Sequence, residues 1–251
     1  MLDSEPAPPT ILHALLTQHV LVALAVTAAF AVCAWLLRGA TVGGALAGFA
    51  VALALFLTAG PGGFAALVSV FFAAWLTTRL GHRRKLALGI AESARGRSAA
   101  QVLANLGTAA GYSVAAQVTG YHALLTAAMA ALAEAAADTV ASECGEALSE
   151  RAYLITTMGA VPAGTNGGVS LLGTVAGVAA AAMVGAVATA THVMPRSALP
   201  FVIGAGILAM VIDSLLGATL EKRGVIGNSG VNFASTIAAG VIALLLGKLG
   251  S

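Results

Sequence analysis

Apolar segments of about 20 residues recur along almost the whole chain, and they restrict the folds that it can adopt. Hydrophobic residues make up 59% of the 251 residues, whereas charged residues make up only 9%. A soluble domain of this length needs a far larger charged surface. A run of about 20 apolar residues is long enough to cross the hydrocarbon core of a bilayer as a helix. The chain is therefore predicted to be an all-α integral membrane protein.

The hydrophobic pattern predicts a polytopic bundle of about eight transmembrane helices. They are expected at 19–37, 41–58, 61–79, 100–118, 121–143, 168–190, 198–217 and 231–247. The second and third segments are separated by Gly60-Pro61-Gly62-Gly63, which is a turn signal. Residues 1–17 hold two acids and three prolines and are predicted to be a mobile tail. Residues 18–251 are then expected to form a single transmembrane helical domain.

The positions of lysine and arginine predict the orientation of this bundle. When the loop 80–99 is placed in the cytoplasm, alternation of the segments leaves only Arg196 and Lys248 of the 12 basic residues outside. Cytoplasmic loops of membrane proteins carry an excess of lysine and arginine. Both termini are therefore predicted to lie outside, in what is expected to be a bacterial inner membrane. Every polar, glycine-rich run then lies on the cytoplasmic side, which is the expected active-site face.

The sharpest polar run follows the apolar segment 121–143. Glu134, Asp138, Ser142 and Glu146 recur every four residues and therefore line one face of a helix. Carboxylates at membrane depth are costly and normally functional. With Glu146, or with Asp213, Asp138 forms a possible Mg²⁺ site, because this ion takes carboxylates together with phosphate oxygens. Polar contacts between packed helices are the competing interpretation.

Glu143 does not share this face. On an ideal helix it points roughly 140° away from Asp138. Two explanations are open from the sequence: either the helix breaks near Gly145, or Glu143 serves another face.

Two glycine-rich runs come directly before predicted helices. The first is Gly164-Thr165-Asn166-Gly167-Gly168, and the second is Gly227-Asn228. The amino terminus of a helix attracts anions, and glycine lets the backbone approach a phosphate closely. The first run is therefore expected to hold phosphate, with the Thr165 and Ser170 hydroxyls as donors. A turn followed by a helix cap is the competing interpretation.

Further polar residues precede or enter the predicted helices. Arg97 comes just before the segment 100–118, and an arginine can bind two phosphate oxygens at once. Asn105 follows Gln101 by four residues, as Asn232 follows Asn228, and amides inside a bundle join helices or bind a ligand.

Several other chemistries have no signature in this chain. The Gly-x-Ser-x-Gly run of hydrolases and the phosphate-binding Gly-x-x-x-x-Gly-Lys-Ser/Thr run are absent from the sequence. The five histidines are scattered and show no zinc-binding spacing. A net charge of +2 gives no indication of nucleic acid as a partner.

Five ordered motifs resemble those of the transmembrane protein 19-like family, which includes the plant and cyanobacterial phytyl-phosphate kinases. The motifs are Gly96 to Asn105, Ala137 to Glu143, Gly164 to Ser170, Asp213 to Thr219 and Val231-Asn232. The resemblance covers roughly residues 35 to 247. Val140 departs from it, because many members are expected to have an aromatic residue there.

This resemblance implies a transferase, namely a kinase that converts a prenyl monophosphate to the diphosphate with Mg²⁺ and a nucleoside triphosphate, CTP being the expected donor. It implies metal or catalytic roles for Asp138, Glu143 and Asp213. It also implies two groups of binding residues, one that holds phosphates and one that contacts the nucleotide or the prenyl phosphate. These are, respectively, Asn166, Gly167, Gly168 and Ser170, and Arg97, Asn105, Asn228 and Asn232.

Two other functions remain open from the sequence. Asp138 and Asp213 each end a predicted helix that is followed by a loop and a glycine-rich helix start, and this weak repeat is typical of transporters. The alternative function is therefore a transporter or flippase of a phosphorylated lipid or small anion. A purely structural role, with the polar runs serving as caps and packing contacts, is the third. The sequence also leaves open whether a kinase would act on the monophosphate or on the free prenol.

Overall fold

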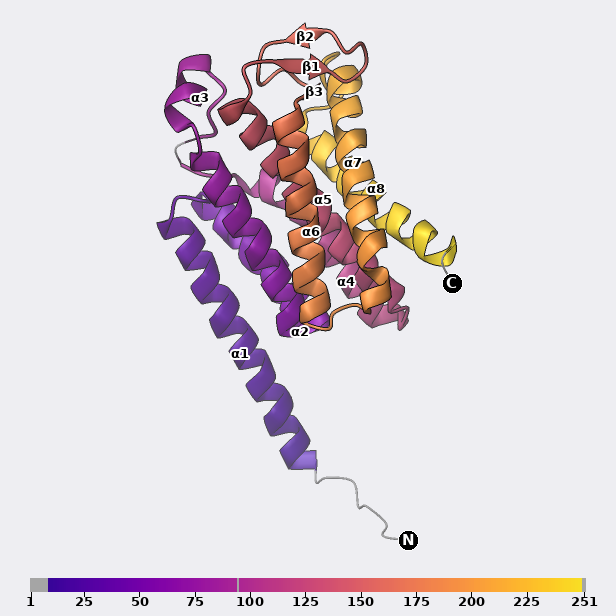
Figure 1. Cartoon of the computed structure of the whole chain (residues 1–251). Coiled ribbons are helices and arrows are strands. Elements are labelled where there is room, and N and C mark those ends of the chain that lie inside the picture. The colour runs from indigo at the N-terminus through magenta and orange to yellow at the C-terminus, as the bar shows by residue number, and fades with distance from the viewer. Residues whose placement is uncertain (1–8, 94, 250–251) are drawn as a thin grey trace.

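The chain folds into a bundle of helices with a small β-sheet over one end (Figure 1). The computed structural model describes residues 9–93 and 95–249. The helices are α1 (Pro9–Leu36), α2 (Val42–Arg79), α3 (His82–Leu88), α4 (Ala99–Thr119), α5 (Ala123–Leu148), α6 (Leu171–Ala190), α7 (Leu199–Leu216) and α8 (Asn228–Leu249). Six helices within the described ranges, α1, α2, α5, α6, α7 and α8, are long and apolar enough to cross a membrane. The predicted class, an all-α polytopic membrane protein, is confirmed.

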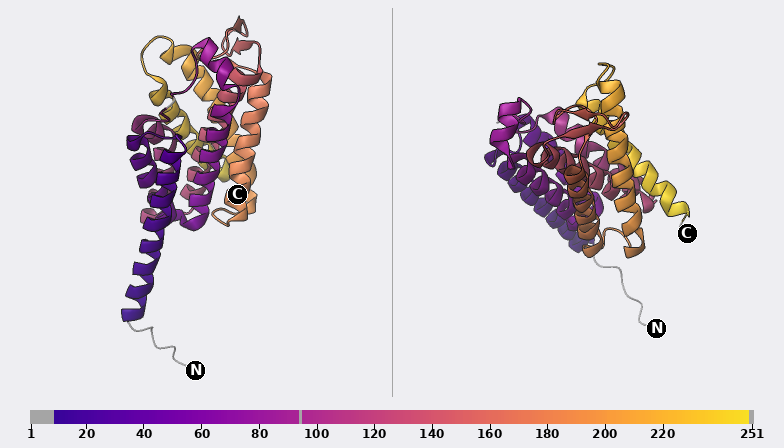
Figure 2. Two further views of the ribbon diagram at one scale, coloured as in Figure 1. Left: turned by 90° about the vertical axis from the view of Figure 1, so that its left-hand side faces the viewer. Right: turned by 45° about the horizontal axis from the view of Figure 1, so that its top comes forward.

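Helix α2 is a hairpin of two helical arms. A straight helix of 38 residues would be about 57 Å long. Instead, the two ends of α2 lie close together. The carbonyl of Leu37, just before α2 begins, accepts hydrogen bonds from two side chains near the end of α2, Trp75 Nε1 at 3.1 Å and Arg79 Nη2 at 2.6 Å. The chain reverses at Gly60, which has φ 70° and ψ −172° and precedes Pro61. The predicted turn and the two predicted segments on either side of it are confirmed (Figure 2).

Several predicted boundaries shift. The predicted tail overlaps α1, because residues 9–17 are helical, whereas residues 1–8 lie outside the described residues. Helix α5 continues five residues past 143, and α8 begins three residues before 231. Helix α7 runs on into a π-helical turn, Gly217–Glu221.

A small sheet that the sequence did not predict occupies the connection between α5 and α6. Its strands are β1 (Ala152–Leu154), β2 (Ala160–Val161) and β3 (Gly168–Val169), in the order β2-β1-β3. Both neighbours pair antiparallel with β1, with Tyr153 opposite Ala160 on one side and Val169 on the other. In Figure 1 the sheet covers the same end of the bundle as α3 and the connection from α7 to α8.

Helix α5 is the centre of the bundle. It contacts α2, α3, α4, α6, α7 and α8. Of its membrane-spanning window 72% is buried, compared with 22–39% for the other five helices. The residues from Ala127 to Ala133 are fully buried, and five of these seven are alanine. Small side chains let neighbouring backbones approach closely, which is how membrane helices pack.

Glycines of α6 bring it against α5. A Cβ added at Gly177 would lie 2.8 Å from the carbonyl oxygen of Ala137 and 2.7 Å from Met210 Sδ. Gly177→Ala is therefore expected to push α6 away from α5 and lower the free energy of unfolding by about 1–3 kcal/mol, the usual cost of overpacking. Thermal unfolding of the purified protein measures this.

The matched control is Gly111→Ala in α4, where an added Cβ meets no atom within 4 Å. Replacing an exposed helical glycine by alanine is expected to stabilise by up to about 1 kcal/mol. Equal melting temperatures for the two variants would contradict the close packing of α5 and α6.

Candidate functional site

A cavity of about 430 Å³ opens where α4, α5, α7 and α8 meet the connection from α5 to α6. Its lining brings together every candidate residue named from the sequence. These are Arg97, Asn105, Asp138, Glu143, Glu146, Thr165, Asn166, Gly167, Gly168, Ser170, Asp213, Asn228 and Asn232. Residues that lie up to 135 positions apart in the chain therefore face one space.

Asp138 of α5 and Asp213 of α7 form the carboxyl pair of this cavity. Both side chains line the cavity, and each lies close enough to act on the charge of the other. Ser235 Oγ of α8 donates to Asp213 Oδ2 at 3.0 Å. Glu134, one turn deeper on α5, is buried, and its Oε1 has no partner among the described residues. Two carboxyl groups this close are not both charged unless a cation lies between them, and otherwise one of them holds a proton.

The donor set at this pair fits a hard divalent cation. Carboxylate and hydroxyl oxygens are ligands that Mg²⁺ takes, and this ion is usually held by one or two carboxylates together with substrate phosphates and water. Glu146 does not complete a protein-only site with Asp138 and Asp213, because no three His, Cys, Asp or Glu side chains in the described ranges are arranged around a metal position. A Mg²⁺ held by this pair would take its remaining ligands from water or from phosphate oxygens.

Arg97 also lines the cavity, and its positive charge acts on Asp138. Its backbone is fixed by the connection from α1 to α2: Arg97 N donates to Gly39 O at 3.1 Å, and Thr41 N donates to Arg97 O at 3.0 Å. Gly96 makes this approach possible, since its φ is 82° and an added Cβ would lie 2.5 Å from the backbone N of Ala40. The backbone position from which the Arg97 side chain extends is consequently fixed.

An amide pair links α4 to α8 on the wall of the cavity. Asn232 Nδ2 donates to Asn105 Oδ1 at 3.0 Å, and Asn105 Nδ2 donates to the backbone O of Gln101 at 2.8 Å. Asn232 Oδ1 is buried and has no hydrogen-bond partner in the part of the chain that the structure describes. A buried acceptor without a donor is costly, so this oxygen is suited to accept from a ligand.

The sequence predicted that the first glycine-rich run lies at a helix start, and this is wrong. Gly168 and Val169 form β3, because they pair with β1, and α6 begins only at Leu171. Ser170 caps α6 by accepting from Gly173 N at 3.1 Å, and Thr165 Oγ1 donates to Pro162 O at 2.7 Å. The run is therefore a turn and a strand followed by the Ser170 cap, and phosphate binding by these residues stays a prediction.

Gly167 holds this turn against α7. Its φ is 74°, and an added Cβ would lie 2.6 Å from the backbone O of Ser214, one residue after Asp213. The turn thus places the exposed Asn166 on the rim of the cavity, next to the carboxyl pair.

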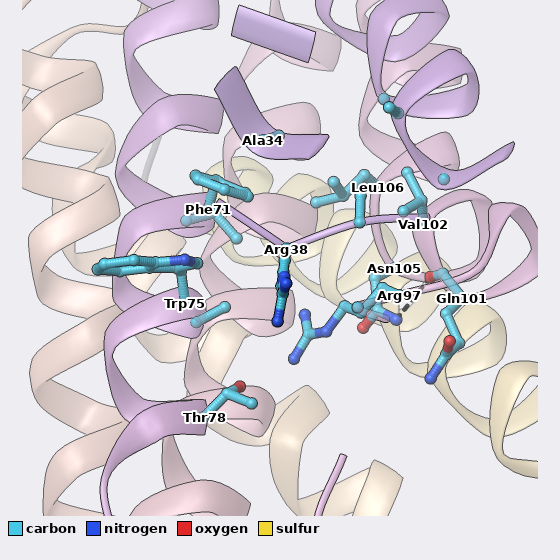
Figure 3. Close-up of a pocket in the computed structure, with 18 of the residues that line it drawn as sticks. Ala34, Arg38, Phe71, Trp75, Thr78, Arg97, Gln101, Val102, Asn105 and Leu106 are labelled. Carbon is cyan, nitrogen blue, oxygen red and sulfur yellow. Dashed lines mark hydrogen bonds between the residues drawn. The ribbon is translucent and has the colours of Figure 1, made fainter. Parts of the chain in front are cut away.

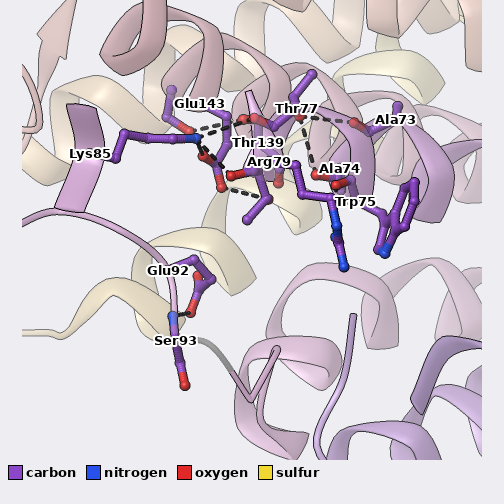
Figure 4. Close-up of polar contacts among 12 residues, drawn as sticks. Ala73, Ala74, Trp75, Thr77, Arg79, Lys85, Glu92, Ser93, Thr139 and Glu143 are labelled. Atoms are coloured by element: carbon purple, nitrogen blue, oxygen red, sulfur yellow. Dashed lines mark hydrogen bonds and ion pairs between the residues drawn. The ribbon is translucent and has the colours of Figure 1, made fainter. Parts of the chain in front are cut away.

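Glu143 points to another face of α5, which was the second of the two explanations open from the sequence. Helix α5 continues through Gly145 to Leu148 without a break. Glu143 forms an ion pair with Lys85 of α3, and Thr78 Oγ1 donates to Glu143 Oε1 at 2.6 Å (Figure 4). Lys85 is only 1% exposed and also donates to the backbone O of Thr77 and Thr78. The charge of Glu143 is thus neutralised within the protein.

Sequence reasoning missed this role of Lys85. Its neighbours in the run His82-Arg83-Arg84-Lys85 suggest a basic anchor at the membrane surface, and only the fold of α3 back onto α5 buries it. Gln101 and Glu92, which also line the cavity, were likewise not chosen, although Ser98 and Gln101 carry the capping-box spacing that starts α4.

Comparison with known proteins places the chain in a family. The family described as Integral membrane protein DUF92 matches residues 25–240. The chain belongs to the DUF92 family. This confirms the resemblance to transmembrane protein 19-like proteins seen in the motifs.

Three DUF92-like relatives cover most of the chain. An uncharacterized membrane protein of Methanocaldococcus jannaschii is 31% identical over 72% of this chain and 74% of its own length. An uncharacterized membrane protein of Synechocystis is 28% identical over 64% of each chain. Protein VTE6, chloroplastic, of Arabidopsis thaliana is 27% identical over 84% of this chain and 66% of its own length. No solved structure matches the chain.

The DUF92 match contains the complete cavity. The lining runs from Ile90 to Asn232, inside the matched range. The cavity therefore belongs to the part of the chain that defines the family.

Proposed function

We propose that this chain is a membrane kinase that transfers a phosphoryl group from CTP, or from another nucleoside triphosphate, to a prenyl monophosphate such as phytyl phosphate. One observation carries the proposal: a single cavity joins a pair of interacting carboxyl groups to an arginine and a glycine-rich turn. The motif resemblance to the family that includes phytyl-phosphate kinases and the relationship to VTE6 support it.

The reaction is a displacement at phosphorus. An oxygen of the acceptor monophosphate attacks the γ-phosphorus of the nucleotide and forms a new P–O bond. The bond from that phosphorus to the β,γ-bridging oxygen breaks, and the nucleoside diphosphate leaves. A phosphate monoester is largely dianionic at neutral pH, since its second pKa is about 6. The attacking oxygen therefore needs no general base, and catalysis depends on positioning and on neutralising charge.

The residues of the cavity divide this work. Arg97, at the rim, would bind the acceptor phosphate and offset its repulsion from the nucleotide. Asn232 and Asn105, on α8 and α4, would orient the ligands by hydrogen bonds. Asn166 and the backbone of Gly167 and Gly168 would contact nucleotide phosphates. Asp138 and Asp213 would hold Mg²⁺, which would supply positive charge for the transferring phosphoryl group.

We place this cavity at the cytoplasmic face, where nucleotides are available, with both termini outside. The cavity is lined in part by Gly168 and Val169 of β3, and the sheet lies at the same end of the bundle as α3 (Figure 1). The connections at that end hold most of the lysine and arginine residues, which favours this orientation.

The alternative of a transporter is less well supported. A transport path needs polar groups near the middle of the membrane, whereas α5 from Ala127 to Ala133, beyond Glu134, is fully buried among apolar neighbours. The two helix hairpins that suggested a repeat also differ, since one connection holds a three-stranded sheet and the other a π-helical turn.

Thermal unfolding with ligands tests the proposal. The purified protein is expected to melt at a higher temperature with CTP, Mg²⁺ and phytyl phosphate together, because ligands that bind only the folded state stabilise it by mass action. ATP, UTP and GTP are compared at the same concentration to identify the donor. A melting temperature unchanged by all four nucleotides would contradict a nucleotide site. Movement of phytyl phosphate across sealed liposomes without nucleotide would instead support transport.

A further inference from the structure

A second cavity, of about 100 Å³, lies between α1, α2 and α4 (Figure 3). Apolar side chains form most of its walls, and Phe30, Ala34, Leu67, Val70, Phe71 and Leu106 are among them. Gly48 of the first arm of α2 also lines it, and a Cβ added there meets no atom within 4 Å. The cavity thus has free space next to Gly48, on the membrane-embedded part of the chain.

Three arginines stand at one end of this apolar cavity: Arg38, Arg79 and Arg97. Arg79 is already engaged, since it bonds to Leu37 O and Trp75 O and stacks on the Trp75 ring at 3.9 Å. Arg38 and Arg97 have no carboxylate within ion-pair distance among the described residues. In Figure 3 their side chains point into the same space, above Thr78 and beside Trp75.

The two cavities meet at shared residues. Glu92, Arg97, Gln101 and Asn105 line both. The Glu92 carboxylate is held by Gln101 Nε2, with N–O distances of 3.4 Å. A ligand with its anionic group at Arg97 would therefore reach the carboxyl pair from one side while its apolar part lies in the second cavity.

We propose that this second cavity binds a segment of the hydrocarbon chain of the lipid phosphate, and that Arg38 and Arg97 together receive its phosphate. The inference rests on the proposed function, because it assigns the acceptor to a place within the same site. The match is one of charge and polarity: two unpaired guanidinium groups fit a phosphate, and the apolar walls fit an isoprenoid chain. The nucleotide would then bind in the larger, more polar cavity.

Filling the space next to Gly48 tests this assignment. A Cβ at Gly48 meets no atom within 4 Å, so Gly48→Leu is expected to fill part of the cavity and keep the fold. The variant is expected to raise KM for a 20-carbon prenyl phosphate by roughly tenfold or more, as if about two methylene groups lost their burial. KM for a five-carbon prenyl phosphate, whose short chain buries far less apolar surface, is expected to change much less. Gly111→Leu, at an exposed position outside both cavities, is the matched control.

Arg38 provides an independent readout through binding. With phytyl phosphate alone, Arg38→Gln is expected to need a roughly tenfold higher ligand concentration than the wild type for the same rise in melting temperature, because one charge-assisted hydrogen bond is lost. Arg38→Lys is expected to need a smaller increase, because it keeps the positive charge. If Gly48→Leu changes both acceptors equally or neither, and Arg38→Gln binds phytyl phosphate normally, the assignment of the second cavity is wrong while the kinase proposal stands. If the wild type transfers phosphate to no acceptor, the kinase proposal fails, and the binding measurements still decide whether the cavity holds the lipid.

Discussion

Asp138→Asn is expected to lower the rate of phosphoryl transfer by about 10²- to 10³-fold, the usual loss when one group that stabilises the transition state is removed. The amide keeps the shape of the side chain but removes the charge that would hold Mg²⁺ with Asp213. Because Asp138 lines an open cavity and contacts its partner there, the variant is expected to fold normally. Transfer of label from a γ-labelled nucleotide to prenyl phosphate by the purified protein measures the rate.

Glu150→Gln is the matched control, since Glu150 is exposed and does not line the cavity. Asp213→Asn is expected to behave like Asp138→Asn, because both carboxyl groups act as one pair. Wild-type transfer by Asp138→Asn would remove this residue from the proposed mechanism, whatever its effect on stability.

Lys85→Met is expected to lower the free energy of unfolding by about 3–5 kcal/mol, because it leaves the Glu143 carboxylate buried without its cation. Lys85 also satisfies the carbonyls of Thr77 and Thr78, at the point where α2 ends, so α3 is expected to detach from α5. Chemical or thermal unfolding of the purified protein measures the change.

Two variants separate the ion pair from a general effect of removing lysine. Lys222→Met removes an exposed lysine and is expected to change stability by less than about 0.5 kcal/mol. The double variant Lys85→Met/Glu143→Leu removes both charges and is expected to recover much of the loss, since a buried pair replaced by apolar residues is often close to neutral. A single Lys85→Met variant as stable as Lys222→Met would show that the pair contributes nothing.

The arrangement of the helices was largely predictable because it depends on patterns within short stretches. Runs of apolar residues located the helices, and Gly60-Pro61 located the reversal inside α2. The spacing of four residues from Glu134 to Glu146 placed Asp138 on a polar face, and the cavity lies on that face. The candidate residues were named one by one, yet all of them line the same space.

What could not be predicted depends on contacts between distant segments. The pairing of β1 with β3 involves only two or three residues of each strand, too few to give an alternating pattern, so Gly168 was assigned to a helix. Lys85 and Glu143 are 58 positions apart, and no local pattern indicates that they form an ion pair. The cavity beside Gly48 exists only because the two arms of α2 fold back beside α1.

The most direct test of the proposed function is transfer of label from γ-labelled CTP to phytyl phosphate, with phytol compared as acceptor, in the presence of Mg²⁺. The account predicts that the wild-type protein forms labelled phytyl diphosphate and that Asp138→Asn forms almost no product. Phytol is expected to stay unlabelled, because an alcohol needs a general base and the proposed mechanism assigns this role to no residue. Labelling of phytol instead of phytyl phosphate would contradict the assigned acceptor. The absence of any labelled diphosphate with CTP, ATP, UTP or GTP would contradict the kinase itself.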